Sequence, residues 1–230
     1  MADRFELHCH SIHSPDSATP VEKLIDRYAA LGFAGFALTD HHSIKGWNSA
    51  REHIRRKRLS LEFIPACEFV TNQGDLLGLY LGEMIDSHDP LEILDQIHSQ
   101  GGLAVLPHPF DSLRGSACRP ERLGREGVKK LDGLEVLNAR STKKSNEAAL
   151  DYVLNTSSAR SLALTGSSDA HFLFEAGKAW TEVPEGMDLA QAIRKRKTLA
   201  AGSLNPFFVH GPTTLVKLGK KLGLLPRAKN

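Results

Sequence analysis

Short apolar runs alternate with longer amphipathic segments along most of the chain. Seven of these runs are bounded by glycine or polar residues, which is typical of buried β-strands. Because neighbouring positions within a run are both apolar, we expect each strand to be covered on both faces. The expected strands are residues 4–8, 35–39, 61–66, 76–81, 103–107, 133–137 and 161–166.

Helical patterns fill most of the intervals between the expected strands. The first begins with Thr19 as N-cap and Pro20 at the first helical position, and it ends at Gly32. One connection, between the third and fourth strands, is too short for a helix and is expected to be a turn around Gly74. The helices are expected at residues 19–32, 89–102, 145–157 and 187–197.

This alternation of strands and helices predicts an α/β fold, with a parallel sheet and helices outside it. Seven strands leave two architectures open, an open doubly wound sheet and a closed barrel. The sequence has no internal repeat, low-complexity tract or linker-like segment that would divide its 230 residues. A single domain is therefore expected.

The amino-acid composition limits the classes of protein to which the chain can belong. Hydrophobic residues make up 41% of the chain and charged residues 24%, and the net charge of +2 gives no general attraction to nucleic acid. The three cysteines, Cys9, Cys67 and Cys118, form no C-x-x-C pair, so a disulfide framework is not expected. With neither a signal-peptide pattern nor an apolar stretch of about 18 residues, the expected location is the cytoplasm.

Histidines and acids gather where the expected strands end. His8 and His10 are two residues apart, so on a strand they project from the same face and leave Cys9 on the other. In both candidate architectures these strand ends meet on one face, where active sites form. The further clusters at strand ends are Asp40-His41-His42, Cys67-Glu68, His108 with Asp111, and Asp169 with His171.

Imidazoles and carboxylates that converge from several strands are the ligands that Zn²⁺, Mn²⁺ and Fe²⁺ use. The candidate ligands outnumber the four that a single zinc needs, which favours two or three ions with shared carboxylates. Taken singly, each residue also fits a structural role, such as a helix cap or a hydrogen-bonded core histidine. A nucleophilic Cys67 is an alternative, but nothing in its surroundings indicates a lowered pKa.

Six motifs occur along the chain in a fixed order. They read ELHCHSIHSPDS, LTDHHS, IPACEFVT, LPHPFD, DGLEVLNAR and GSSDAHF followed by EAG. In this order they resemble the PHP family (polymerase and histidinol phosphatase domain), in its short metal-dependent phosphoesterase branch, over about residues 5–183. The resemblance implies a distorted (β/α)7 barrel in one domain, residues 1–230, with C-terminal helices in 187–230 packed on the barrel.

The resemblance also implies a cluster of two or three divalent ions, Zn, Mn or Fe, with Glu68 as the bridging ligand. Asp75 stands where many relatives carry histidine, so it either replaces that ligand or leaves two ions instead of three. Glu6 stands where aspartate is usual and is expected to hydrogen-bond beneath the site. The implied metal ligands are His8, His10, Asp16, His41, Glu68, Asp75, His108, Asp169 and His171.

Other residues are expected to assist these ligands. Asp40 is expected to orient an imidazole. Arg140 follows the sixth strand and is the first candidate to bind a phosphoryl group through its planar guanidinium, with Asn138 bracing its loop. A metal-bound water, Asp169 and His171 are the candidates to protonate the leaving group. His13 and His42 are not counted as ligands.

The predicted function is hydrolysis of a phosphate ester of a small metabolite or nucleotide, by hydroxide that the metal ions activate. Two alternatives remain open: a non-catalytic metal-binding module, and an amidohydrolase-like enzyme that cleaves a C–N bond. Neither a membrane nor a stable nucleic-acid complex is expected as a partner. The basic segments 51–58 and 194–197 are interpreted as solvated helix ends, and the leucine- and lysine-containing tail as a helix that docks on the barrel.

Overall fold

The computed structural model describes residues 2–225. Within this range the strands form one nine-stranded sheet in the order β7-β6-β5-β4-β3-β2-β1-β8-β9. The strands are β1 Asp3–Glu6, β2 Gly35–Leu38, β3 Glu62–Thr71, β4 Gly74–Leu79, β5 Leu103–Leu106, β6 Gly133–Asn138, β7 Ala163–Ser167, β8 Ala179–Val183 and β9 Leu199–Gly202.

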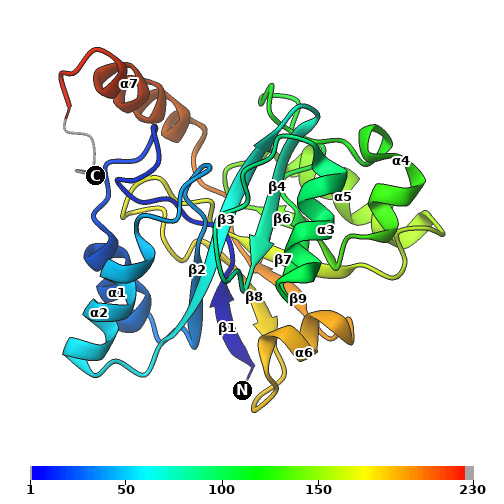
Figure 1. Ribbon diagram of the computed structural model, residues 1–230, viewed down its shortest axis with the longest axis horizontal. Coiled ribbons are helices and arrows are strands. Elements are labelled where there is room, and N and C mark those ends of the chain that lie inside the picture. The colour runs from blue at the N-terminus through cyan, green and yellow to red at the C-terminus, as the bar shows by residue number, and fades with distance from the viewer. Residues whose placement is uncertain (1, 226–230) are drawn as a thin grey trace.

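Helices surround this sheet, with α1 and α2 on one side, α3, α4 and α5 on the other, and α6 at the end where β1 begins (Figure 1). The last helix, α7, stands apart near the opposite end of the sheet (Figure 1). The helices are α1 Val21–Ala30, α2 Trp47–Lys57, α3 Pro90–Ser99, α4 Pro120–Lys129, α5 Lys143–Asn155, α6 Leu189–Arg194 and α7 His210–Lys221, which follows a short 3-10 turn at Phe207–Val209. Within residues 2–225, no helix has the length and apolar character needed to cross a membrane.

The two outer ends of the sheet approach each other, so the sheet is a nearly closed barrel. The hydroxyl of Thr181 on β8 donates to the carbonyl of Gly166 on β7 at 2.9 Å and accepts from its N–H at 3.0 Å. A side chain at Gly166 would bring its Cβ to 2.7 Å from the Trp180 carbonyl oxygen, so the seam requires glycine. The barrel, and not the open sheet, is therefore the correct architecture.

The barrel is distorted because two of its strands, β4 and β8, run antiparallel to both of their neighbours. β4 pairs antiparallel with both β3 and β5, since a tight turn joins β3 to β4. β8 pairs antiparallel with β1 and with β9. The sequence pattern predicted the turn at Gly74 but not β8 or β9, so the expectation of a parallel sheet was wrong at β4 and β8.

An apolar layer fills the barrel toward the α6 end. Side chains from β1, β3, β4, β5 and β7 pack there against Leu189, Ala192 and Ile193 of α6. The polar residues that follow the strands are thereby restricted to the opposite end of the barrel. Thr19, expected as the N-cap of α1, does not cap that helix; its hydroxyl donates to the His171 carbonyl at 3.0 Å instead.

Candidate metal centre

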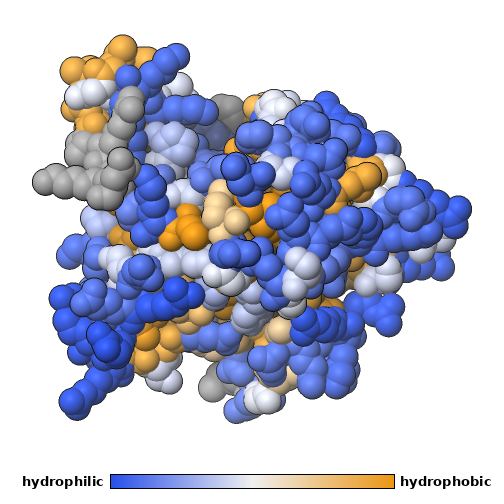
Figure 2. All heavy atoms as spheres, viewed as in Figure 1, coloured by the Kyte–Doolittle hydropathy of each residue, from blue (hydrophilic) through white to orange (hydrophobic). Residues whose placement is uncertain are grey.

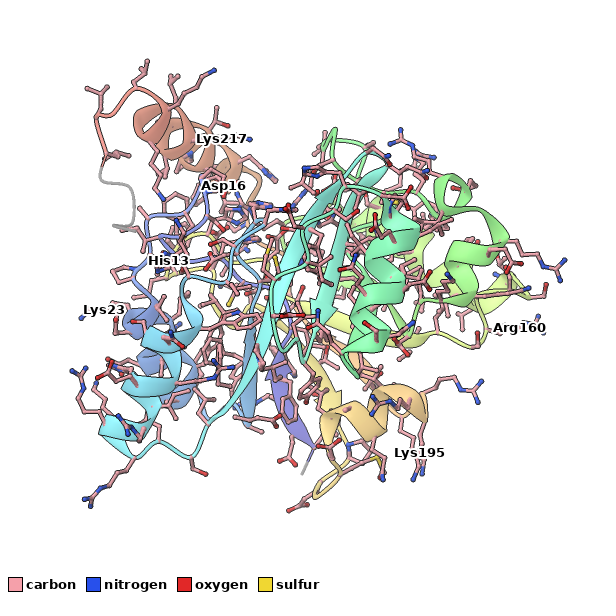
Figure 3. The ribbon with its side chains drawn as sticks, viewed as in Figure 1. His13, Asp16, Lys23, Arg160, Lys195 and Lys217 are labelled. Atoms are coloured by element: carbon pink, nitrogen blue, oxygen red, sulfur yellow. The ribbon has the colours of Figure 1, made fainter. Side chains whose placement is uncertain are left out.

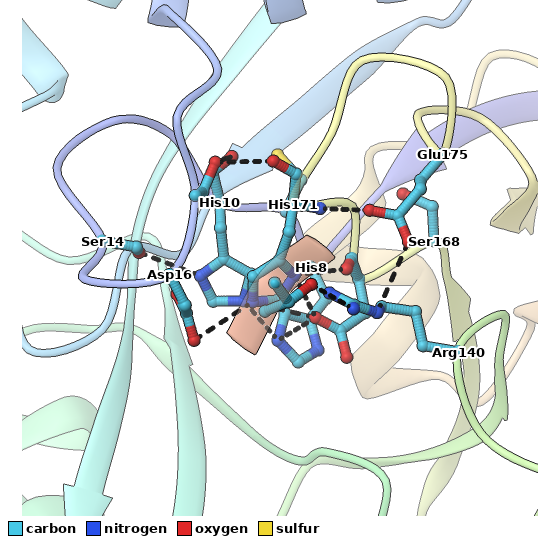
Figure 4. A network of polar contacts seen from close by, with 12 residues as sticks. His8, His10, Ser14, Asp16, Arg140, Ser168, His171 and Glu175 are labelled. Atoms are coloured by element: carbon cyan, nitrogen blue, oxygen red, sulfur yellow. Dashed lines mark hydrogen bonds and ion pairs between the residues drawn. The ribbon is translucent and has the colours of Figure 1, made fainter. Parts of the chain in front are cut away.

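Eight of the nine candidate ligands converge at the ends of their strands, and part of this network is drawn in Figure 4. They come from the segments after β1, β2, β5 and β7, and from β3 itself. Six of the eight are at most 3% exposed, and only Asp16 and His41 reach further toward solvent. These eight are His8, His10, Asp16, His41, Glu68, His108, Asp169 and His171.

The most enclosed group of ligand atoms comes from β3 and from the segments after β1 and β7. The Nε2 atoms of His8 and His10 lie 3.1 Å apart. Glu68 Oε2 lies 3.4 Å from each, and Asp169 Oδ1 lies 3.6 Å from His8 and 3.3 Å from His10. Both carboxylate oxygens are buried and have no hydrogen-bond partner among the described residues.

Orphaned buried oxygens are costly unless a cation occupies the space between them. A tetrahedral ion with bonds of about 2.0–2.1 Å separates its ligand atoms by about 3.3–3.4 Å. Five separations among the atoms from His8, His10, Glu68 and Asp169 are 3.1–3.6 Å, which is close to this size. The donor set therefore suits one divalent ion.

Two further groups adjoin the first, and one of them shares Glu68 with it. Asp16 Oδ2 lies 3.3 Å from His41 Nε2 and 3.4 Å from His171 Nε2. On the other side, His108 Nε2 lies 3.2 Å from Glu68 Oε1. Glu68 thus directs one oxygen toward His108 and the other toward the first group, which is the geometry of a bridging carboxylate.

Three of the imidazoles, those of His8, His10 and His171, are held in orientation through their second nitrogen. His8 Nδ1 faces Glu135 Oε1 at 3.3 Å, and His171 Nδ1 faces the Asp169 carbonyl at 2.9 Å. His10 Nδ1 lies 3.1 Å from Ser14 Oγ, which itself donates to Asp40 at 2.8 Å. With Nδ1 occupied in this way, the Nε2 lone pair is directed toward the other ligand atoms of the cluster, where an ion would bind. Asp40 therefore lies one hydroxyl away from the imidazole it was expected to orient.

Sequence reasoning missed two charged residues at this site. Glu135, on β6, faces His8 and accepts from the backbone N–H of His108 at 2.8 Å. Arg114 donates to Asp169 Oδ2 at 2.6 Å. Glu135 was visible as a lone acid inside an expected strand, but Arg114 lies in an irregular loop and no motif pointed to it.

The surroundings of the centre keep two ligands, Asp169 and His10, in their binding forms. Burial raises the pKa of Asp169, but Arg114 and His8 outweigh it and hold that pKa well below the usual range. Burial, followed by the neighbouring His171 and His41, lowers the pKa of His10 to about 3. At neutral pH the carboxylate is therefore ionised and His10 is neutral, as metal binding requires.

Asp75, the ninth candidate, lies in the wall of a cavity that opens over the ligands. It is 2% exposed, and its Oδ1 has no hydrogen-bond partner among the described residues. Burial, and then the charge of Glu68, raises the pKa of Asp75 to about 6. The Asp75 carboxyl group therefore lies within electrostatic range of Glu68.

Arg140 borders the cavity but is largely engaged by the chain itself. Its Nη2 donates to the Val209 carbonyl at 3.1 Å and to the Thr213 hydroxyl at 2.5 Å, and its Nε lies 3.4 Å from Glu175 Oε1. Asn138 Oδ1 accepts from the Arg140 backbone N–H at 2.9 Å, which braces the loop as expected. Arg140 thus joins the loop after β6 to the segment leading into α7.

The cysteines play no part in this centre. Cys67 is fully buried, and burial raises the pKa of its thiol, so a nucleophilic thiolate is not favoured there. Cys9 turns away from the histidines beside it, and its Sγ lies 3.3 Å from the Ala37 carbonyl. His42, which was not counted as a ligand, stacks on the ring of His88.

A cavity of about 730 Å³ opens over the ligands. Asp16, His41 and His171 reach its floor. Four basic side chains in its wall bring positive charge or hydrogen-bond donors: Arg114, Arg140, His210 and Lys217. Such a cavity suits an anionic substrate.

Beneath the ligands lies Glu6, as expected. Its Oε1 accepts from the N–H groups of Ser168 at 3.0 Å and His8 at 3.2 Å, and Tyr28 donates to its Oε2 at 3.2 Å. Burial raises the pKa of Glu6 to about 7. An unfolded chain ionises this group near pH 4.5, whereas the folded protein keeps it protonated until about pH 7.

This difference predicts the pH dependence of a Glu6→Gln variant. A raised folded-state pKa contributes stability that is present at low pH and is lost as the pH rises through 7. From pH 5 to pH 8 the variant should therefore gain about 2–3 kcal/mol relative to the wild type. Urea unfolding of both proteins, each free of metal, measures this gain. A stability difference that stays constant with pH would contradict it.

Comparison with known proteins agrees with this geometry. A family model described as PHP domain matches residues 6–199. An uncharacterized protein of Methanocaldococcus jannaschii is 33% identical over 186 residues, which cover 79% of this chain and 71% of that protein. The 5'-3' exoribonuclease Rnm of Salmonella typhimurium is 28% identical over 179 residues, 77% of this chain but only 50% of the exoribonuclease.

Among solved structures, the chain is similar to a two-domain protein from Bacteroides vulgatus, described as containing a predicted PHP-like metal-dependent phosphoesterase. The TM-score is 0.70 at 18% sequence identity, and the match covers 94% of this chain and 70% of that one. At this identity the likeness establishes the fold alone.

Proposed function

The chain belongs to the PHP domain family, and we propose that it is a metal-dependent hydrolase that cleaves a phosphate ester of a small metabolite or a nucleotide. The observation that carries this proposal is the pair of orphaned oxygens, Glu68 Oε2 and Asp169 Oδ1, directed at two imidazole Nε2 atoms. A buried cluster of this kind destabilises the folded protein unless it binds a metal ion.

The residues divide into sets that would hold two or three ions. His8, His10, Glu68 and Asp169 would hold the first. Asp16 and His41, with His171 beside both, would hold the second. His108, the other oxygen of Glu68 and Asp75 would hold a third. Mixed nitrogen and oxygen ligands suit Zn²⁺, Mn²⁺ or Fe²⁺.

Bound ions of this type supply positive charge for a phosphoryl group and lower the pKa of water. The chain supplies the remaining charge from the wall of the cavity. Arg114 and Lys217 border the space above the ligands, and Arg140 completes the basic rim. Their role is to bind the phosphate oxygens and to offset the negative charge that grows as the ester bond breaks.

Of the two side-chain candidates to protonate the leaving group, Asp169 is the less suitable. Its Oδ2 accepts from Arg114 at 2.6 Å and from Asn138 at 3.1 Å, and its pKa is held well below the usual range by Arg114 and His8 despite burial. Asp169 therefore acts as a ligand. His171 is constrained as well, because its Nε2 belongs to the second ligand set and its Nδ1 faces the Asp169 carbonyl at 2.9 Å. The proposed proton donor is therefore a water molecule that the ions would hold.

The relatives favour a nucleotide as the substrate. The matching relative is named a 5'-3' exoribonuclease, which means that it cleaves RNA from one end. The basic rim of the cavity suits the phosphates of such a substrate. This chain spans only half the length of that relative, so its activity is a proposal here.

A substrate panel tests the proposed function. The protein is loaded in turn with Mn²⁺, Zn²⁺ and Fe²⁺ and is given nucleotides, short 5'-phosphorylated RNA, small phosphomonoesters and N-acyl amino acids. We expect phosphate or nucleotide release from at least one phosphoester and loss of that activity in a chelator. Cleavage of only the C–N substrates, or no turnover by the fully loaded protein, would refute it.

A further inference from the structure

The C-terminal helix α7 lies outside the segment that matches the family model, residues 6–199. It stands over the loop that follows His10, and Figure 3 shows Lys217 of this helix close above Asp16. Figure 2 shows an apolar surface on the same part of the molecule. Leu215, Leu218 and Leu222 are 68%, 51% and 61% exposed there.

Lys220 of the same helix is buried and only 5% exposed. An amphipathic helix ordinarily buries leucine and exposes lysine, so this inversion needs a specific cause. Burial lowers the pKa of Lys220, and the nearby charges of Asp16 and Asp40 act in the opposite direction. An ammonium group in such a place must be compensated by the atoms around it.

That compensation comes from the backbone of one loop. Lys220 Nζ donates to the carbonyl oxygens of Ile12 at 2.7 Å, Ser14 at 2.6 Å and Ser17 at 2.5 Å. An ammonium group has three donors, and here each of them has a carbonyl from the same six-residue stretch. Lys220 therefore holds the three loop carbonyls around its ammonium group.

The loop contains no helix or strand, so its conformation depends on contacts of this kind. Its ends are tied by the bond from the Ile12 N–H to the Thr19 carbonyl at 2.8 Å and by the Ser17 hydroxyl, which donates to the His171 carbonyl at 2.8 Å. Between these ties lies Asp16, whose Oδ2 is held 3.3 Å from His41 Nε2.

We propose that Lys220 is a positioning residue, whose ammonium gathers the three carbonyls of residues 12–17 and thereby fixes Asp16 beside His41 and His171. The proposal rests on the metal-binding part of the proposed function. It makes the C-terminal helix a component of the metal centre, although the helix supplies no ligand. Without the ammonium, the loop carbonyls lose their common partner and Asp16 is free to leave the second set of ligands.

The test is a metal titration of the full-length Lys220→Met variant, in which the side-chain stem is kept and the charge is removed. Competition with a chromophoric chelator, using Mn²⁺ and then Zn²⁺, gives the affinity for each ion. We expect one ion to bind about 10- to 100-fold more weakly and the others to keep their wild-type affinity. Hydrogen exchange at the amides of residues 12–17 should become faster.

Two further variants serve as controls. Lys220→Arg retains a charged donor and should recover most of the affinity. Lys23→Met removes one exposed lysine from α1 and should bind every ion as the wild type does. If Lys220→Met does not fold, Lys220→Gln, which keeps a short amide donor, is titrated in its place.

Wild-type metal affinities and unchanged loop exchange in Lys220→Met would overturn the proposal. An equal loss of affinity for every ion would also overturn it, because that result indicates general destabilisation. The titration uses no substrate, so a protein that binds its ions but cleaves no phosphoester refutes only the proposed activity. A wild-type protein that binds no ion refutes both.

Discussion

Replacing Glu68 with glutamine should reduce kcat/KM for phosphoester hydrolysis by at least about 10³-fold. The reason is that Glu68 is the carboxylate shared between ligand groups. Its Oε2 lies 2.9 Å from His41 Nδ1 and 3.4 Å from the Nε2 atoms of His8 and His10, and its Oε1 lies 3.2 Å from His108. Glutamine has a similar shape but no negative charge, so fewer ions should remain bound.

The measurement is steady-state kinetics on the best phosphoester of the panel, together with the metal content of the variant. Glu62→Gln is the matched control, because Glu62 lies on the same strand and is exposed. We expect this control to keep wild-type activity and wild-type metal content. Hydrolysis by Glu68→Gln at the wild-type rate would show that the reaction does not depend on the cluster.

Removal of bound ions with a chelator should lower the melting temperature by at least about 5 °C for each ion lost. An ion present at 100 times its dissociation constant stabilises the native state by about 2.7 kcal/mol. For a chain of this size, each kcal/mol corresponds to about 2–4 °C. The loss of stability is larger still because the buried carboxylates of Glu68 and Asp169 remain without a cation.

Thermal unfolding with and without excess Mn²⁺ measures this effect. Glu62→Gln should show the full shift, and Glu68→Gln a smaller one. The effect should also grow between pH 5 and pH 8, because His8 must lose a proton to bind an ion. Burial favours its neutral form, but Asp169 and Glu68 hold its pKa well above the usual value. Identical melting temperatures with metal and with chelator would contradict the assignment of the cluster.

Most of the candidate ligands could be found in the sequence because the rules that place them are local, whereas Asp16 and Asp75 were implied by the family resemblance alone. Spacing by two puts His8 and His10 on one face of the chain after β1, and parallel strands deliver their C-terminal ends to a common edge. The same rules separated Cys9 from its neighbours. Asp169 and His171 follow β7 in the same way, and the structure brings them to His10 across 160 residues of chain.

The remaining features depend on approaches between distant segments that periodicity does not record. Barrel closure rests on the contact of Thr181 with Gly166, and the strand pattern alone left the open sheet possible. Arg114 reaches Asp169 from an irregular loop. Lys220 resembled the solvated lysines of an amphipathic tail, and only the structure shows that it is buried against the loop after β1.

The central claim is that this chain holds divalent ions in the cluster built around Glu68 and Asp169. Elemental analysis tests it most directly, after the purified protein is equilibrated with Mn²⁺, Zn²⁺ or Fe²⁺ and unbound metal is removed. We expect two or three ions per chain for at least one metal, and fewer in Glu68→Gln. A wild-type protein without stoichiometric metal under all three conditions would contradict the claim.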